Sequence, residues 1–355
     1  MHAHGRHRDE AMDTLSELLQ SIRLDGALFL HAEFREPWCV DAPSGTDLAR
    51  QMLEGAPQLA ICHLVLEGRC WVRMPDGPAL ELHAGEVAVL PYGDPHLIGS
   101  GVHHAPVTLA YLVQPRLPDL TRIRYGGDGA RMRIVCGWFA YERHLVHPLI
   151  AALPPLFCVD LARRPCGAWL AQSVRTAMQE EAMAHPGAQV IGAKVAEALF
   201  IESVRGHVEA LPPAQTGWLA GLRDPLIGRC LALLHAQPAR AWSMAELARE
   251  AGMSRSVLAD RFRRLVGVAP MHYLARWRMA LATRLLREPG STLTRVGEAV
   301  GYPCESAFHR AFKREHGVAP GQWRLRNSGW PHPPSAVELQ LQPVQHLVTR
   351  QHTGH

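Results

Sequence analysis

Cysteine and histidine side chains are the groups in this sequence that could do redox or metal chemistry, and their spacing limits which chemistry is open to them. The 355 residues contain eight cysteines, at positions 39, 62, 70, 136, 158, 166, 230 and 304, with no Cys-x2-Cys pair. Structural zinc sites and small disulfide-stabilised domains both show characteristic cysteine spacings. The scattered pattern favours reduced thiols, and therefore a cytoplasmic protein.

Three histidines, His2, His4 and His7, lie close together in the polar segment 1–10. They could bind a metal, but we expect a disordered tail, because polar chain ends are seldom held in place. The composition, 47% hydrophobic and 20% charged, is that of an ordinary globular protein. No segment approaches the ~18 apolar residues of a membrane-spanning helix, and the start does not resemble a signal peptide. We expect no membrane partner.

The clearest structural pattern is a repeat between Trp242 and Arg324. The tetrapeptide Gly-Val-Ala-Pro at 267–270 returns at 317–320. Ahead of each copy, Leu258-x3-Phe262-Arg263-Arg264 returns at the same offset as Phe308-x3-Phe312-Lys313-Arg314. A repeat at a fixed period indicates that one supersecondary unit is used twice.

Hydrophobic periodicity within each copy predicts two helices joined by a glycine turn. In the first copy an apolar helical face leads to Gly252, and Ser254 can cap the next helix. In the second copy Gly301 marks the turn, and Pro303 lies near the start of the next helix. The second helices are predicted to bury Val257, Leu258, Phe262, Leu265 and Val266 in one copy, and Ala307, Phe308, Ala311 and Phe312 in the other. Each copy is therefore a helix-turn-helix, and one continuous helix, Met271–Leu286, separates the two.

The charge of this part of the chain points to an anionic partner. From Leu222 to Arg326 there are 18 Lys and Arg against 8 Asp and Glu, a net charge of +10. The whole chain carries +4, which leaves −6 for the remainder. A basic module beside an acidic one is typical of a surface that neutralises phosphates.

Several features of this segment resemble the AraC/XylS transcriptional regulators. They are the two helix-turn-helix units, the connecting helix, Gly301-Tyr302 before the second helix of the last unit, and Gly-Val-Ala-Pro-x2-Trp-Arg after that helix. The resemblance covers about a hundred residues. It implies that the second helix of each unit, which we call the reading helix, enters the major groove of double-stranded DNA. The two reading helices would enter adjacent turns on one face of the DNA. Successive grooves lie roughly 34 Å apart, so a rigid spacer helix suits this task.

The resemblance also implies which side chains face DNA. In the first reading helix they are Arg255, Ser256, Ala259, Asp260 and Arg263, and in the second they are Glu305, Ser306, His309, Arg310 and Lys313. Arg310 suits a bidentate contact with guanine, Ala259 could meet a thymine methyl, and Asp260 could meet a cytosine amino group. Alternatively, the first helix makes mainly phosphate contacts, the role expected of Arg264 and Arg314. Any single arginine here could also be a solvated surface charge.

The first half of the chain has a different character, with short apolar runs separated by glycine and proline. Such runs predict strands of an antiparallel barrel or sandwich between Gly26 and about Cys158. The predicted strands are Ala27–Phe34, Leu59–Leu66, Cys70–Met74, Ala79–Leu82, Val87–Leu90, Val107–Leu112 and Arg133–Phe139. The fold class is therefore multidomain α+β: an N-terminal antiparallel β-barrel with helices, and a C-terminal all-α domain.

Within these strands, Gly85-x5-Pro91-x-Gly93-x2-His96 resembles the second cupin motif, and His63-x3-Glu67-Gly68 resembles a degraded first motif. Val65 stands where the family has a second histidine, and Glu67 falls too early for the glutamate ligand. Only His63 and His96 remain of four ligands, whereas a catalytic metal usually needs at least three from the protein. We therefore expect no cofactor and no enzyme activity, and assign His63 and His96 to an effector pocket. Weak metal binding by the pair stays an alternative.

Cys136-Gly137 and Leu153-Pro154-Pro155-Leu156 extend the resemblance, over roughly residues 12–160, to the cupin sensor domain of one branch of these regulators. Some members of that branch sense reactive chlorine or other oxidants through cysteines. This makes Cys136 and Cys39 redox candidates, although a sensor thiol needs exposure and a lowered pKa. The alternative is that most cysteines are small buried hydrophobic residues.

Two amphipathic helices are predicted at 165–184 and 188–209, after a short one spanning Met12–Ile22. The pair could form a homodimer interface, as in the family, or pack against its own barrel. The proline-rich stretch Leu211–Gly217 is the best linker. The expected organisation is a tail at 1–10, a cupin-like sensor domain at 11–160, a dimerisation segment at 161–211, a linker at 212–221, a DNA-binding domain at 222–326 and a disordered tail at 327–355.

The sequence thus predicts a transcriptional regulator that binds promoter DNA, responds to a small-molecule or redox effector and works as a homodimer. RNA polymerase is an expected further partner and activation the expected outcome, although the sequence alone leaves repression open. The alternative from another class is a cupin metalloenzyme fused to a DNA-binding module.

Overall fold

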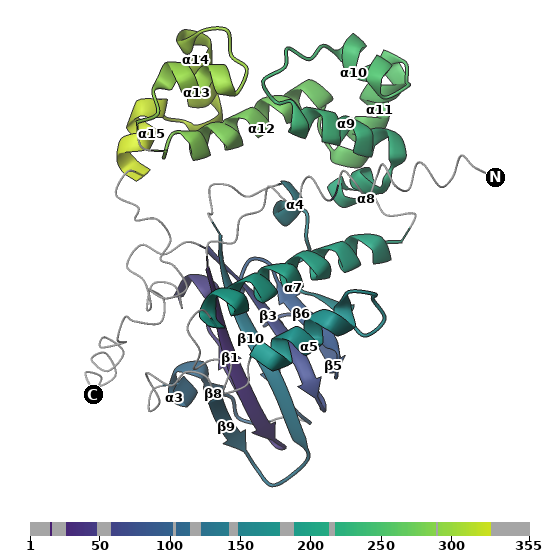
Figure 1. Cartoon of the computed structure of the whole chain (residues 1–355), viewed down its shortest axis with the longest axis vertical. Helices are drawn as coiled ribbons and strands as arrows, with labels where there is room; N and C mark the ends of the chain where they lie inside the picture. Colours follow the sequence, from purple (N-terminus) through teal and green to yellow (C-terminus); the bar gives the residue numbers. More distant parts are fainter. Residues whose placement is uncertain are drawn as a thin grey trace, which may run out of the picture. The chain divides into compact units, whose positions relative to one another are not determined.

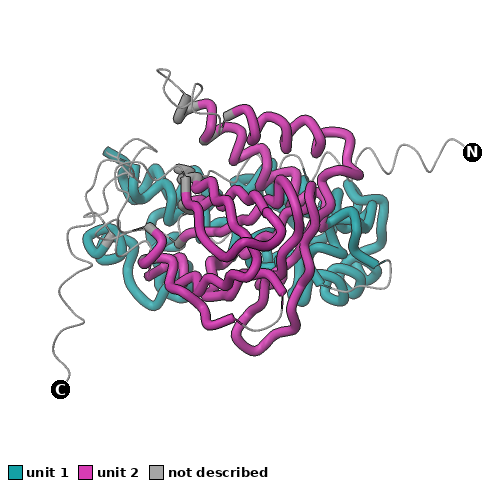
Figure 2. The backbone as a smooth tube through the Cα atoms, turned by 90° about the horizontal axis from the view of Figure 1, so that it is seen from below, with its two compact units in different colours: residues 1–23, 143–153, 208–331 teal, residues 24–142, 154–207, 332–355 magenta. Residues whose placement is uncertain are grey.

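The computed structural model describes residue 15 and residues 26–47, 58–101, 104–113, 122–141, 148–177, 188–212, 217–288 and 290–327. The chain divides into two compact units, coloured separately in Figure 2. The sheet unit comprises residues 24–142, 154–207 and 332–355, and the helical unit comprises residues 1–23, 143–153 and 208–331. The predicted N-terminal helix, apart from the buried Leu15, and both predicted tails apart from Asn327 lie outside the described residues.

The described residues of the sheet unit form two sheets. The six-stranded sheet has the order β11-β6-β3-β10-β1-β9, and the five-stranded sheet has the order β5-β4-β7-β2-β8. The bounds are β1 Gly26–Arg35, β2 Cys39–Ala42, β3 Gln58–Glu67, β4 Arg69–Arg73, β5 Ala79–His83, β6 Glu86–Leu90, β7 His96–Gly99, β8 Val107–Thr108, β9 Arg122–Gly126, β10 Arg131–Tyr141 and β11 Phe157–Asp160.

Long strands dominate the six-stranded sheet, where β10 lies between β1 and β3 and pairs with both in antiparallel register (Figure 1). Alternate residues of these strands, such as Leu30, Ile61 and Ile134, enter one core cluster with Val40 and Ile98 of the other sheet. This alternation is why the apolar runs could be recognised as strands from sequence.

Three details of the predicted barrel are wrong. The described strands form two separate sheets, not a single closed barrel, and β1–β9 and β2–β8 pair in parallel. The predicted strand Val107–Leu112 stops after Thr108 and continues as helix α3 (Leu109–Val113). The Thr108 hydroxyl accepts a hydrogen bond from the Tyr111 N–H at 3.3 Å, so a local cap starts a helix where apolar residues alone suggested a strand.

Helices α5 (Gly167–Ala177) and α7 (Ala188–Ala210) lie over the six-stranded sheet in Figure 1. Arg175 of α5 donates to the Leu66 carbonyl of β3 at 3.0 Å, and Phe200 of α7 lies 5.7 Å from Phe139 of β10 between ring centroids. Of the two alternatives left open for this pair, packing against their own sheet is therefore the one that the structure shows. A homodimer through their outer faces stays a prediction.

The helical unit contains α4 (Pro148–Ala151) and eight helices of the C-terminal region. Their bounds are α8 Trp218–Arg223, α9 Pro225–Ala236, α10 Met244–Glu250, α11 Arg255–Val266, α12 Pro270–Leu285, α13 Leu293–Ala299, α14 Glu305–His316 and α15 Pro320–Asn327. Helix α8 occupies the second part of the segment predicted as a linker. The domain boundaries themselves stay predictions.

Both helix-turn-helix units form as their local signals indicate. Ser254 caps α11 by accepting from the Val257 N–H at 3.3 Å. Gly252 and Gly301 take positive φ angles, 67° and 81°, in the two turns. Gly267 and Gly317 end the reading helices in the left-handed conformation, which a side chain would disfavour.

Helix α12 provides packing surfaces for both units. Tyr273 near its start meets Phe262 of α11 edge-on, with ring centroids 5.8 Å apart. Met279 and Ala282 near its end join a buried cluster with Phe308 and Phe312 of α14. The predicted spacer helix is therefore confirmed, and it fixes one reading helix relative to the other.

Candidate functional site

The two reading helices expose equivalent arcs of side chains. Leu258 and Phe262 are fully buried on the inner side of α11, as Phe308 and Phe312 are on α14. Successive helical residues are turned by roughly 100°, so the opposite side of each helix is centred on Asp260 and on Arg310. The exposed residues of these arcs are Ser256, Val257, Asp260, Arg263 and Arg264 in α11, and Ser306, Arg310, Lys313 and Arg314 in α14.

Most residues predicted to face DNA lie on or beside these arcs. Arg255 and Glu305 are exposed in the first turns, whereas Ala259 and His309 are half-buried at the edge. Glu305 also accepts a hydrogen bond from the Thr294 hydroxyl of α13 at 2.5 Å, which restrains its carboxylate. The position of each side chain relative to DNA stays a prediction.

Val257 is the residue of this surface that the sequence analysis missed. It was expected in the core, but 49% of its surface is exposed, because it lies in the first turn of α11, beside Asp260 on the outer arc. Its apolar character gave the wrong signal. The helical phase of Leu258 and Phe262, which leaves position 257 outside their stripe, could have shown it.

The positively charged side chains on the two arcs are available to an anionic partner. Arg263, Arg264, Arg310, Lys313 and Arg314 make no ion pair with any residue that the structure describes. By contrast, Arg261 donates from Nε and Nη2 to the Asp224 carboxylate, at 2.9 and 2.5 Å, and this pair joins α11 to the cap of α9. Arg261 is thus structural, whereas the exposed cations remain available to phosphates.

A thiol begins the second reading helix. Cys304 occupies the cap position of α14 that Ser254 holds in α11, and it is exposed. Hydrogen bonds from Ser306 and from the Ala307 N–H lower its pKa, and Arg310 adds to the effect. The sequence analysis did not single out this cysteine.

A second candidate site is a pocket lined by both sheets of the sheet unit. Its lining combines apolar side chains with His63 of β3, His96 of β7 and Cys136 of β10. The β3–β10 register places Cys136 directly opposite His63.

The three polar side chains form one hydrogen-bonded chain. His63 Nε2 lies 2.8 Å from His96 Nε2, and His63 Nδ1 lies 3.0 Å from Cys136 Sγ. At the far end His96 Nδ1 is 2.9 Å from the Asp94 carbonyl, which can only accept. With both rings neutral, His96 donates to Asp94, His63 donates to His96, and the Cys136 thiol donates to His63.

Burial keeps the hydrogen-bonded side chains of Cys136, His63 and His96 uncharged. Desolvation lowers the pKa of His63 well below its usual value, with a contribution from His96, and lowers the pKa of His96 as well. Burial raises the pKa of the Cys136 thiol to about 12. The site therefore holds a thiol and two neutral imidazoles near neutral pH.

The two cysteines proposed as redox candidates lie in different sheets. Cys136 is in β10, whereas Cys39 begins β2, opposite Gly99. Both thiols are buried, and burial raises the pKa of each. Neither has the exposed, acidic character of a reactive thiol.

The remaining positions of the degraded cupin motif do not add a ligand. Val65 is fully buried in the core, and the Glu67 carboxylate accepts from Arg131 at 2.8 Å at a half-exposed position. Among the described residues, no three His, Cys, Asp or Glu side chains are grouped so that they could hold a metal ion. The described helices likewise include none that is long and apolar enough to cross a membrane.

Comparisons with known proteins identify relatives for both the sheet part and the helical part of the chain. A cupin family model matches residues 13–209, and a helix-turn-helix domain model matches residues 247–326. A putative AraC-like transcription regulator of Streptomyces antibioticus is 36% identical over 274 residues, which cover 76% of this chain and 88% of that protein. The transcriptional regulator AlkR of Acinetobacter baylyi is 28% identical over 330 residues, 89% of this chain and 100% of that protein.

The RCS-specific transcriptional activator RclR of Escherichia coli is 26% identical over 318 residues, 89% of this chain and 98% of that protein. Among solved structures, the DNA-binding domain of AdpA in complex with a target DNA is 30% identical, with a TM-score of 0.28, and the match covers 29% of this chain and 93% of that one. The chain belongs to the AraC family of transcription regulators, with an N-terminal cupin domain ahead of its helix-turn-helix DNA-binding domain.

Proposed function

We propose that this regulator reads two blocks of an operator with α11 and α14 and is controlled by a small molecule bound in the pocket of His63 and His96. The observation that carries the proposal is the pair of equivalent exposed arcs on helices held by one spacer. Arg310 would contact guanine in one block, and Asp260 a cytosine amino group in the other. Arg263, Arg264, Lys313 and Arg314 would contact phosphates and set the salt dependence of binding.

The effector would act by changing how the cupin domain holds the DNA-binding domain. It can shift that equilibrium only by the difference between its affinities for the two arrangements. The exposed outer sides of Trp169 on α5 and Ile191 on α7, 65% and 63% exposed, support a homodimer through these helices. The regulator would work in the cytoplasm, with RNA polymerase as a partner and without enzyme activity of its own.

Selection of bound sequences from a random DNA pool tests this proposal. We expect a motif with two blocks separated by about one helical turn, and binding that weakens steeply with salt. Random recovered sequences with purely salt-controlled binding would contradict specific reading. Metal analysis of the purified protein tests the enzyme alternative, which requires stoichiometric iron, manganese or zinc.

A further inference from the structure

We infer that the effector of the cupin pocket is an uncharged, largely apolar small molecule with at most one hydrogen-bond acceptor. This inference rests on the proposed effector role of the pocket and names the class of ligand that fits it. Sugars, other polyols and carboxylic acids are excluded by the same argument.

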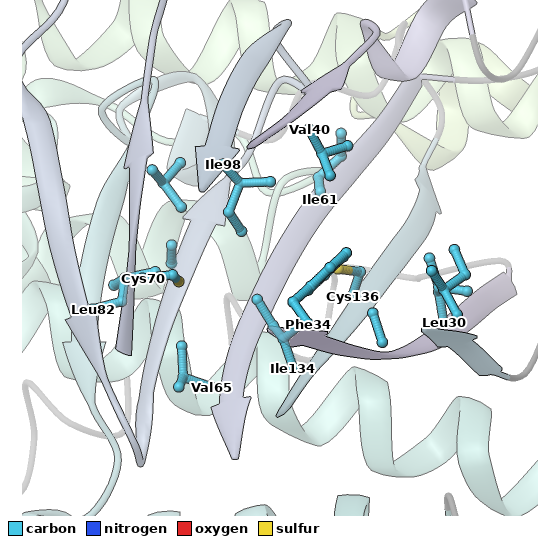
Figure 3. Close-up of a cluster of buried hydrophobic side chains, with 14 of the residues drawn as sticks. Leu30, Phe34, Val40, Ile61, Val65, Cys70, Leu82, Ile98, Ile134 and Cys136 are labelled. Atoms are coloured by element: carbon cyan, nitrogen blue, oxygen red, sulfur yellow. The ribbon is translucent and has the colours of Figure 1, made fainter. Parts of the chain in front are cut away.

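The first observation is the chemistry of the lining. Its apolar side chains come from β1, β2, β3, β7, β9, β10 and α3, and no Asp, Glu, Lys or Arg side chain lines the pocket. Figure 3 shows several of the lining residues turned toward one another in the core. The apolar lining comprises Leu30, Ala32, Phe34, Val40, Ala42, Pro43, Ile61, Ile98, Leu109, Ile123 and Ile134, with the indole of Trp138.

The second observation is that the polar groups are already used. The Cys136 thiol, both rings and the Asp94 carbonyl satisfy one another in the chain described above. A ligand hydroxyl could bond to His63 or His96 only by breaking a bond that exists without it. Each buried polar group of a ligand that stays unpaired costs roughly 1–3 kcal/mol.

The third observation concerns charge. Both histidines are held neutral by burial, so the pocket presents no cation to a carboxylate. Burying an unpaired ion is far more costly than burying a neutral polar group. The Trp138 indole also lines the pocket, and its N–H makes no hydrogen bond within the described part of the chain, so this ring offers a ligand one donor at most.

Four probes built on a six-membered ring separate these classes: toluene, acetophenone, benzoate and myo-inositol. Each is titrated into the full-length protein, and binding is measured by calorimetry. We expect toluene and acetophenone to bind, and benzoate and myo-inositol to bind about tenfold more weakly or worse. Binding of benzoate or myo-inositol as tight as that of toluene would overturn the inference.

A matched pair of variants locates the binding. Ile134 lines the pocket, whereas Leu82 belongs to the same core cluster without lining it, and both are fully buried. Ile134→Ala should change the affinity for toluene several-fold, and Leu82→Ala should leave it unchanged. If either variant does not fold, Ile134→Val and Leu82→Val give the same comparison with less cavity. Equal effects of both substitutions would show that toluene binds elsewhere, against the inference.

DNA selection on the same preparation keeps the two proposals apart. A two-block motif with no binding of toluene or acetophenone would overturn the ligand class and leave the regulator intact. Binding of toluene in the pocket without any DNA motif would support the ligand class and overturn the proposed function.

Discussion

Asp260 and Arg310 occupy the same place in the two reading helices, and their charges are opposite. Each lies at the centre of the exposed arc, seven residues before the glycine that ends its helix. A carboxylate can accept from a base amino group but repels phosphate, whereas a guanidinium attracts both guanine and phosphate. The two blocks of the operator should therefore differ in sequence, and α14 should supply more of the affinity.

Arg310→Ala should weaken operator binding by about 1–3 kcal/mol and relax the base preference at one position. The physical reason is the loss of a bidentate contact with guanine. Binding of a set of single-base operator variants would measure it. Arg229→Ala, an exposed arginine on α9, is the control and should change little. Equal weakening on every operator variant would show that Arg310 contacts only phosphate.

Asp260→Ala should have the opposite effect on the affinity for DNA. Removing a carboxylate that faces DNA should tighten binding to non-specific DNA, while the preference for one base pair of the first block is lost. Selection from a random pool with each protein, followed by a salt titration on non-specific DNA, tests both parts. An unchanged motif would remove Asp260 from base reading.

Val257 should contact a thymine methyl, because it is an exposed apolar side chain beside Asp260 in the first turn of a reading helix. Replacing one thymine of the first block by uracil removes only the methyl group, and should weaken wild-type binding by roughly 0.8 kcal/mol. Val257→Ala should bind the thymine and uracil operators more nearly equally. If no uracil substitution affects the wild-type protein, Val257 contacts no methyl.

Acid should destabilise the cupin domain through its buried histidines. Burial lowers the pKa of His63 and His96 in the folded protein, so below 6.5, the ordinary histidine value, the unfolded chain binds more protons than the folded one. Their contribution to stability is therefore present above pH 6.5 and declines as the pH falls below it.

Urea unfolding at neutral pH and at a pH below 6.5 measures this loss. His63→Gln keeps a hydrogen-bonding side chain that does not titrate, so its stability should fall less over the same interval. His104→Gln, at an exposed position, should behave like the wild type. An identical pH dependence in all three proteins would contradict the assignment to His63.

Thiol labelling should rank the cysteines by exposure and pKa. Cys304 is exposed with a lowered pKa, whereas Cys136 is buried with its pKa raised to about 12. In the native protein, iodoacetamide should modify Cys304 first and Cys136 only slowly, since the thiolate is the reacting form. Mass spectrometry of peptides after brief labelling decides the order. Rapid labelling of Cys136 would contradict this order and support Cys136 as a redox sensor.

The two helix-turn-helix units and the spacer helix could be predicted from the sequence because their signals are local, whereas α8 and α9 were not predicted. Ser254, Gly267 and Gly317 act on backbone groups within a turn of themselves, and the apolar period fixes the buried side of each helix. The repeat, the charge of this segment and its resemblance to the AraC/XylS regulators then led to the prediction that it reads DNA with two helices. Local signals do not show which distant residues meet. His63 and His96 could therefore be assigned to one pocket only by resemblance to a family.

Tertiary structure decided what depends on partners distant in the chain. The hydrogen bonds that link Cys136, His63, His96 and the Asp94 carbonyl form because the strand register places Cys136 opposite His63. That register depends on the pairing between β10 and β3. The division into two sheets and the parallel β1–β9 and β2–β8 pairs have the same origin. The sequence by itself determined which residues could do chemistry and which helices carry them; long-range pairing alone determined which of them meet, because no local signal encodes a strand's neighbour.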